Sequence, residues 1–186
     1  MKSIIQFSLI TLCSVFLMGC GAITEPLSYG NPDADVVIEI FSDVECPACA
    51  SISPQVKDAA ETFKKDVLLK YYHFPLTYHK YAFDGAEASE CARDQGKGWQ
   101  YLEDLYANQT NLSDNYFVSL ANKLGLDEEA FSECFKSHKY KSVVMSQYNE
   151  GRSRTIPGTP TIYVNGNVIK WSGNITFEAY LKSLIN

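Results

Sequence analysis

The sequence lacks any excess of positive charge. Its 186 residues include 16 Lys and Arg against 22 Asp and Glu, which gives a net charge of −6 at pH 7. Because proteins that bind nucleic acid carry a basic patch for the phosphates, nucleic acid is not an expected partner. Glycine and proline are also scarce, at 11 and 7, and 46% of the residues are hydrophobic, so a collagen-like or disordered chain is excluded. One folded domain is expected at this length.

Long hydrophobic runs are missing too. The most apolar segment, residues 4–18, follows a single lysine and is roughly 15 residues long, whereas a spanning helix needs about 20. This pattern predicts a signal peptide over residues 1–19, which exports the protein. Residues 17–20, Leu-Met-Gly-Cys, resemble the lipobox of bacterial lipoproteins, apart from a methionine where a smaller residue is usual. We therefore expect lipid on Cys20, with ordinary secretory cleavage or an uncleaved anchor as alternatives.

Residues 20–35 predict a tether. They contain Pro26, Gly30 and Pro32 and show no apolar periodicity. Fully extended, such a segment could reach roughly 50 Å. The folded domain, expected over residues 36–186, would then be anchored by lipid to a bacterial membrane without inserting into it. Its location would be the cell envelope, on the periplasmic side or the extracellular face.

Four cysteines remain within the expected domain: Cys46, Cys49, Cys91 and Cys134. An even number in an exported protein predicts disulfides, because the compartment outside the cytosol is oxidising. Cys46 and Cys49 can close only a tight ring, whereas a bridge between Cys91 and Cys134 would stabilise the fold by up to ~4 kcal/mol in the loop-entropy model. Two unpaired thiols remain an alternative for Cys91 and Cys134. Zinc binding is a weaker one, because neither has a near cysteine neighbour, and no metal is expected.

Strand-like and helical patterns alternate along the domain. An apolar, β-branched run at 36–41 predicts a buried strand, and Pro47 stands at the start of a helix that runs to about residue 65. Asn165-Gly166 is a strong hairpin signal. The order of elements predicts an α/β fold with a mixed sheet and a helical insertion. The other expected elements are a strand at 67–72, the insertion at about 79–150, strands at 161–164 and 167–171, and a helix at 175–185.

The spacing Cys46-Pro47-Ala48-Cys49 carries the chemistry. A thiol reacts as its thiolate, and the unpaired N–H groups of a helix N-terminus favour negative charge at Cys46. Cys49 lies one turn later on the same side, where it can resolve a mixed disulfide formed at Cys46. A lone Cys-x-x-Cys also occurs in metal sites or by chance. Its position between a strand and a helix in an exported chain favours redox chemistry.

With these motifs the chain resembles the DsbA-type thiol-disulfide oxidoreductases of the thioredoxin superfamily. The resemblance covers nearly the whole expected domain. It rests on the helical insertion and on three segments: Phe41-Ser42-Asp43-Val44-Glu45-Cys46-Pro47-Ala48-Cys49, Gly158-Thr159-Pro160-Thr161 and Val164-Asn165-Gly166.

The resemblance implies a role for each motif residue. Cys46 would be the exposed nucleophile and Cys49 the buried resolving cysteine. Pro160 would be a cis proline packed opposite them, and Thr159 would offer its backbone to an extended substrate peptide. A disulfide between the two remaining cysteines, Cys91 and Cys134, resembles one found in the insertion of some relatives.

Glu39 lies in the strand that leads to the motif, and Ala48 lies within the motif. The family places an acid where Glu39 stands, which implies a proton relay beneath the resolving cysteine, with a carboxyl pKa raised by burial. Alternatively, Glu39 points outward from an alternating strand. Ala48 departs from the most oxidising relatives, which carry histidine there. Since alanine offers neither charge nor donor to the Cys46 thiolate, we expect a weaker oxidant.

The sequence therefore predicts an enzyme, a monomeric thiol-disulfide oxidoreductase without a cofactor. Its expected partners are unfolded or reduced exported proteins, which would receive disulfides from the Cys46/Cys49 pair. A quinone-linked membrane thiol oxidase would then reoxidise that pair. The alternatives are a reductase or isomerase, or a non-catalytic chaperone or metal-carrying module on the same scaffold.

Overall fold

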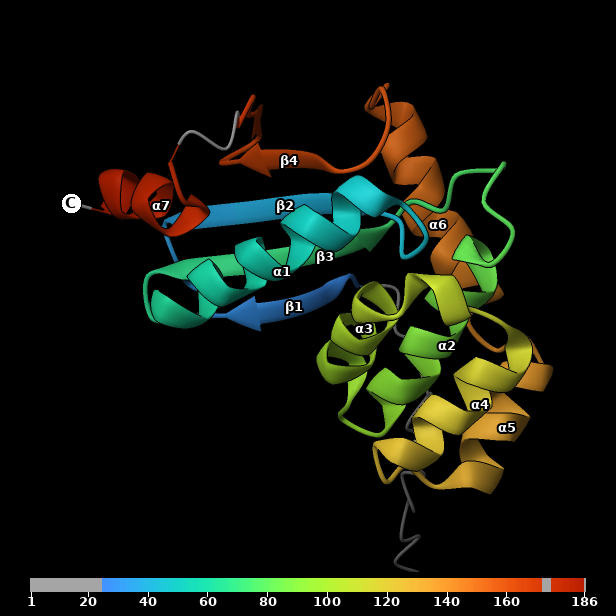
Figure 1. Ribbon diagram of the computed structural model, residues 1–186. Coiled ribbons are helices and arrows are strands. Elements are labelled where there is room, and N and C mark those ends of the chain that lie inside the picture. Colours follow the sequence, from blue (N-terminus) through green and yellow to red (C-terminus); the bar gives the residue numbers. More distant parts are fainter. Residues whose placement is uncertain (1–24, 172–174, 186) are drawn as a thin grey trace, which may run out of the picture.

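A computed structural model of the chain describes residues 25–171 and 175–185. The predicted signal peptide and the lipid site at Cys20 lie outside these residues. The strands within these residues are β1 (Leu27–Gly30), β2 (Val36–Ser42), β3 (Val67–His73), β4 (Thr161–Val164) and β5 (Asn167–Val168). They form one mixed sheet in the order β1-β3-β2-β4-β5 (Figure 1). The predicted α/β fold with a mixed sheet is confirmed.

The central strand is β2, which pairs parallel to β3 and antiparallel to β4. Its side chains alternate between the two faces of the sheet. Ile38, Ile40 and Ser42 share the face covered by α1 (Pro47–Thr62), since the Ser42 hydroxyl contacts the hydroxyl of Ser53 on that helix. In Figure 1, α1 crosses this face with α7 (Phe177–Ile185) beside it.

The prediction of a tether over residues 20–35 is wrong for its second half. Leu27–Gly30 form β1, which pairs antiparallel to β3 and buries Leu27. The Nε1–H of Trp99 donates a hydrogen bond to the carbonyl of Ser28 at 3.2 Å. The strand was missed because four residues between two prolines are too few to show alternation, and partners distant in sequence hold it in place.

A helical insertion connects β3 to β4, over a range close to the predicted 79–150. Its last helix, α6 (Lys141–Ser153), packs Tyr148 against Phe74, which lies just beyond the end of β3. A disulfide joins Cys91 on α2 (Ala82–Asp94) to Cys134 on α5 (Glu128–Lys136), with their Cα atoms 5.9 Å apart. The insertion contains α2 (Ala82–Asp94), α3 (Gly98–Ala107), the 3₁₀ turn η1 (Gln109–Asn111), α4 (Asp114–Lys123), α5 (Glu128–Lys136) and α6 (Lys141–Ser153).

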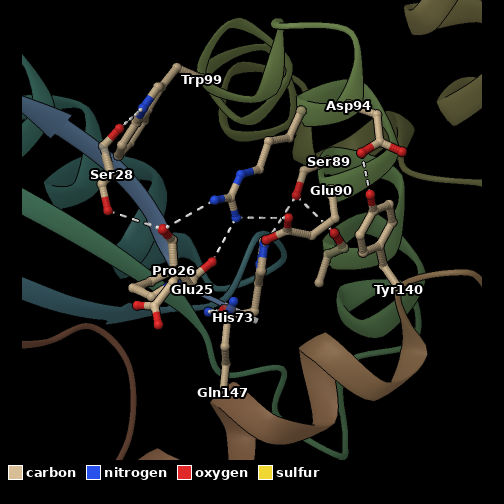
Figure 2. A network of polar contacts seen from close by, with 12 residues as sticks. Glu25, Pro26, Ser28, His73, Ser89, Glu90, Asp94, Trp99, Tyr140 and Gln147 are labelled. Carbon is tan, nitrogen blue, oxygen red and sulfur yellow. Dashed lines mark hydrogen bonds and ion pairs between the residues drawn. The ribbon is translucent and has the colours of Figure 1, made fainter. Parts of the chain in front are cut away.

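The insertion is joined to the sheet by a buried polar network (Figure 2). The Nε2 atom of His73 on β3 lies 3.2 Å from a carboxylate oxygen of Glu90 on α2. The other oxygen of Glu90 pairs with Arg93 at 3.2 Å, and Arg93 donates to the carbonyl of Glu25 at 2.7 Å. The side chain of Gln147 on α6 accepts a hydrogen bond from the His73 backbone N–H. One network thus connects the sheet, two helices of the insertion and the start of the described chain.

The closing hairpin has the turn that its sequence predicts. Asn165 and Gly166 both adopt positive φ, at 47° and 77°, as a type I′ turn requires. The Asn165 side-chain oxygen also accepts a hydrogen bond from the Val37 backbone N–H at 2.7 Å, which ties the turn to β2. β5 is shorter than the predicted strand at 167–171, since it ends at Val168.

Candidate active site

Cys46 and Cys49 lie where β2 leads into α1. Cys46 is the N-cap residue of α1 and Pro47 is its first residue, so the free N–H groups of the first turn lie next to the Cys46 sulfur. Cys46 is buried, at 7% exposed, and not exposed as the resemblance implied, because the carbonyl of Thr159 lies against its sulfur. Cys49 is fully buried. Pro47 and Ala48, between them, are exposed. Both cysteines are free thiols in this structure.

The loop that precedes β4 faces the two cysteines. The bond between Thr159 and Pro160 is cis, and the Cys46 thiol donates to the Thr159 carbonyl at 3.4 Å. The structure therefore brings together the predicted residues Cys46, Cys49, Thr159 and Pro160, although they are separated by more than a hundred positions in the chain.

The environment of Cys49 opposes its ionisation. Burial raises the pKa of the Cys49 thiol to about 12, although hydrogen bonds from the Ser42 hydroxyl, the Asp43 backbone and the Thr159 hydroxyl partly counter this effect. Cys49 is therefore protonated at neutral pH in the reduced protein. Any reaction that releases Cys49 as a thiolate must overcome the free-energy cost of placing a negative charge on this buried sulfur.

The loop between β2 and Cys46 is held by Asp43, whose importance the sequence did not reveal. One carboxylate oxygen of Asp43 accepts a hydrogen bond from the Glu45 backbone N–H at 2.7 Å. The other accepts from the Leu76 backbone N–H at 2.7 Å and lies 2.8 Å from Nδ1 of His79. The Glu45 carboxylate in turn accepts from the backbone N–H of Tyr81 at 2.6 Å.

The insertion also contacts this loop. The side-chain amide of Gln109 donates to the carbonyls of Val44 and Cys46, at 2.8 and 3.0 Å. Val44 is buried against Gly85 on α2, where an added Cβ would lie 2.7 Å from a Val44 methyl carbon. No motif in the sequence marks Gln109 or Gly85, because their roles depend on the way the insertion folds back onto α1.

The predicted relay position of Glu39 is wrong. Three residues before Ser42 on an alternating strand, Glu39 points to the face opposite α1 and Cys49. Both oxygens of its carboxylate bind the Arg154 guanidinium, at 2.9 and 3.0 Å. Burial raises the pKa of Glu39, but hydrogen bonds and positive charge from Arg154, together with a hydrogen bond from Tyr72, bring it below its usual value. Glu39 is thus an ion-pair partner, as the outward-pointing alternative predicted.

Within residues 25–171 and 175–185, no group of three or more His, Cys, Asp or Glu side chains is arranged to hold a metal ion. None of their helices is long and apolar enough to cross a membrane.

The family model described as "Thioredoxin" matches residues 23–186, and the chain belongs to this family. Its fold is that of the DsbA-type proteins, as the sequence predicted. The chain is 26% identical to BdbD from Bacillus subtilis, with 87% of this chain and 91% of that one covered and a TM-score of 0.69. The thiol-disulfide exchange protein alpha-DsbA2 from Wolbachia pipientis shares the fold at 18% identity and a TM-score of 0.75, covering 88% of this chain and 86% of that one.

A further structural neighbour is the thiol-disulfide oxidoreductase MdbA from Actinomyces oris, at 20% identity, a TM-score of 0.73 and coverage of 88% and 85%. Among curated proteins, the chain is 34% identical over 142 residues to Na(+)/H(+) antiporter NhaA 1 from Mycolicibacterium gilvum. That match covers 74% of this chain and 23% of the antiporter, so the chain spans about a quarter of the length of such curated relatives.

Proposed function

We propose that the protein is a thiol-disulfide oxidoreductase of the cell envelope that donates disulfides to exported proteins through Cys46 and Cys49. The observation that carries the proposal is the position of the Cys46 sulfur. It lies at the N-terminus of α1 and 3.4 Å from the carbonyl that precedes cis Pro160, one turn before a fully buried cysteine.

The proposed reaction begins with Cys46 and Cys49 joined as a disulfide. A thiolate of the substrate attacks Cys46, the bond to Cys49 breaks, and its electron pair remains on Cys49. The second substrate thiolate then attacks the substrate sulfur of the mixed disulfide, and Cys46 leaves as a thiolate. The substrate loses two electrons and gains a disulfide. The free N–H groups at the start of α1 favour negative charge on the departing Cys46 sulfur.

The proposal includes the cellular setting. Lipid on Cys20 would hold the protein at the membrane, and a quinone-linked membrane thiol oxidase would reoxidise Cys46 and Cys49. The pattern of residues 1–20 supports export and lipid attachment. Labelling of cells with an alkyne fatty acid should mark the wild-type protein and leave a Cys20→Ser variant unmarked. Label on both proteins would refute attachment at Cys20.

The test of the reaction uses the oxidised protein and reduced, unfolded ribonuclease A. We expect one disulfide transferred per protein molecule, loss of transfer in Cys46→Ser, and retained transfer when Cys91 and Cys134 are both replaced by alanine. The reduction potential of the Cys46/Cys49 pair should lie well above about −270 mV, the value for thioredoxin. A value near that of thioredoxin would favour the reductase. Ribonuclease refolding unaffected by Cys46→Ser would favour a chaperone.

A further inference from the structure

Four buried hydroxyl groups form a continuous network beside Cys49. The Ser42 hydroxyl lies 2.8 Å from the hydroxyl of Ser53 and 2.7 Å from that of Tyr106. The Tyr106 hydroxyl lies 2.6 Å from that of Tyr71. Each residue comes from a different element, namely β2, α1, α3 and β3. The insertion therefore contributes Tyr106 to a cluster otherwise built by the sheet and the active-site helix.

The network lies beside Cys49. Ser53 follows Cys49 by one turn of α1, and the Ser42 hydroxyl that Ser53 contacts is buried there as well. The Ser42 hydroxyl favours the charged form of Cys49 and so counters part of the rise that burial causes in the pKa of this thiol. The ionisable groups that influence Cys49 electrostatically are Cys46 at the start of α1, Tyr71 from β3 and Tyr106 from α3. The carboxylate of Asp43 is occupied by backbone and histidine partners.

The hydroxyl groups of the network can all donate in the direction of Cys49. Each hydroxyl has one proton to donate and two lone pairs that accept. In one consistent orientation Tyr71 donates to Tyr106, Tyr106 and Ser53 both donate to Ser42, and Ser42 donates to Cys49. A hydroxyl that already accepts two hydrogen bonds is a stronger donor, because chains of hydrogen bonds polarise one another. Every proton of the network can thus be directed toward the sulfur.

We propose that Ser42 is a catalytic residue that stabilises the Cys49 thiolate as it leaves, and that Tyr106, with Tyr71 and Ser53, positions and polarises Ser42 for this task. The inference rests on the proposed function, since it concerns the step in which a thiol attacks Cys46. In that step the Cys46–Cys49 bond breaks, a bond from Cys46 to the attacking sulfur forms, and the electron pair remains on Cys49. Ser42 donates a hydrogen bond to this new anion, a role similar to that of an oxyanion hole.

The direct test is the rate at which dithiothreitol reduces the oxidised protein at pH 7. Ser42→Ala should be slower by roughly 10-fold or more, the size expected when one hydrogen bond to a charged group is lost. Tyr106→Phe, which removes one oxygen atom, should be slower by about 3-fold or more through its effect on Ser42. Ser42→Thr restores a hydroxyl at this position and should recover most of the rate.

The matched control is Tyr101→Phe. Tyr101 is buried like Tyr106, but its hydroxyl donates to the Phe117 carbonyl at 2.7 Å and does not belong to the network. Tyr101→Phe thus removes one buried hydroxyl, as Tyr106→Phe does, and its rate of reduction by dithiothreitol should match that of the wild type. Circular dichroism of all variants establishes that they are folded.

A second measurement separates leaving-group stabilisation from a general disturbance of the site. In a Cys49→Ala background, Cys46 is loaded with thionitrobenzoate, and dithiothreitol releases it without any departure of Cys49. Here Ser42→Ala and Tyr106→Phe should change the rate by less than about 2-fold. An equal slowing in this background, or unchanged rates in the full protein, would overturn the inference. Failure of the wild type to oxidise ribonuclease A would overturn only the proposed function, because reduction by dithiothreitol is measured independently.

Discussion

At the scale of single residues, Arg154 shows how one side chain organises the face of the sheet opposite α1. Its guanidinium binds both oxygens of Glu39 and lies 5.2 Å from the ring centre of Phe41 and 5.3 Å from that of Tyr163. The aromatic rings and the carboxylate together hold the planar cation on two sides. The ion pair between Arg154 and Glu39 therefore stabilises the fold, and it lies on the face of the sheet opposite the cysteines.

This arrangement predicts the effect of Glu39→Gln. The folded-state pKa of Glu39 is below its usual value, so its carboxylate stabilises the fold above the unfolded-state pKa of about 4.3, and this stabilisation is lost as the pH falls through the lowered folded pKa. We expect the variant to be less stable by about 1–2 kcal/mol at pH 7, with a smaller difference at acidic pH.

Urea unfolding at several pH values measures this stability difference. The rate of reduction by dithiothreitol should change by less than about 2-fold, because Glu39 does not face Cys49. If the variant were reduced much more slowly while its free energy of unfolding stayed unchanged, Glu39 would act as the proton relay that the sequence predicts.

The contrast between these residues shows what could be read from the sequence. Cys46 and Cys49 were recognisable because residue type and local spacing carry their chemistry, whereas the role of Pro160 was implied by the resemblance to the DsbA family. Glu39 was assigned to the wrong face, since the length of the loop between β2 and α1 determines which strand residue lies beneath Cys49. The network of Ser42 and Tyr106 could not be predicted, because it forms only when α3 packs against the sheet.

At the scale of elements, the close approach of α2 to the active-site loop depends on one glycine. Gly85 leaves room for Val44, whose side chain is buried. Valine is stiff at χ1 and has little freedom to move away. Helix α2 therefore constrains the backbone that leads to Cys46, in addition to the hydrogen bonds of Asp43 and Gln109.

Gly85→Ala tests this constraint. The new methyl would lie 2.7 Å from the Val44 methyl carbon, and overpacking of this kind costs about 1–3 kcal/mol. We expect lower stability and slower reduction by dithiothreitol. Val44→Ala in the same chain makes space for the methyl, so the double variant should be more stable than the sum of the two single effects. Strict additivity in urea unfolding would mean that the two side chains do not meet.

Elements with strong local signals were predictable, and those held by distant partners were not. The hairpin at Asn165-Gly166 follows from turn chemistry within two residues. By contrast, β1 exists because β3 and Trp99 bind its backbone and because Arg93 binds the carbonyl of Glu25 just before it. The sequence around Pro26 and Pro32 contains none of that information.

At the scale of the whole molecule, the disulfide lies apart from the two cysteines that we propose as the redox pair. Cys91 and Cys134 are 43 residues apart and join two helices of the insertion, away from Cys46 and Cys49. Replacing both by alanine should lower the free energy of unfolding by about 2–4 kcal/mol, because a long loop in the unfolded chain is no longer closed. Reduction of the Cys46–Cys49 disulfide should keep its rate within about 2-fold of the wild type. Unchanged stability in urea would contradict the structural role.

Because β1 begins at Leu27, the segment that could separate the folded domain from a membrane is short. Leu27 lies level with Tyr71 and Ile40, close to the end of the sheet from which the chain continues to Cys46, and Arg93 fixes the carbonyl of Glu25. If Cys20 carries lipid as proposed, the segment up to Glu25 spans at most about 18 Å. An enzyme held this tightly would act within a thin layer above the bilayer.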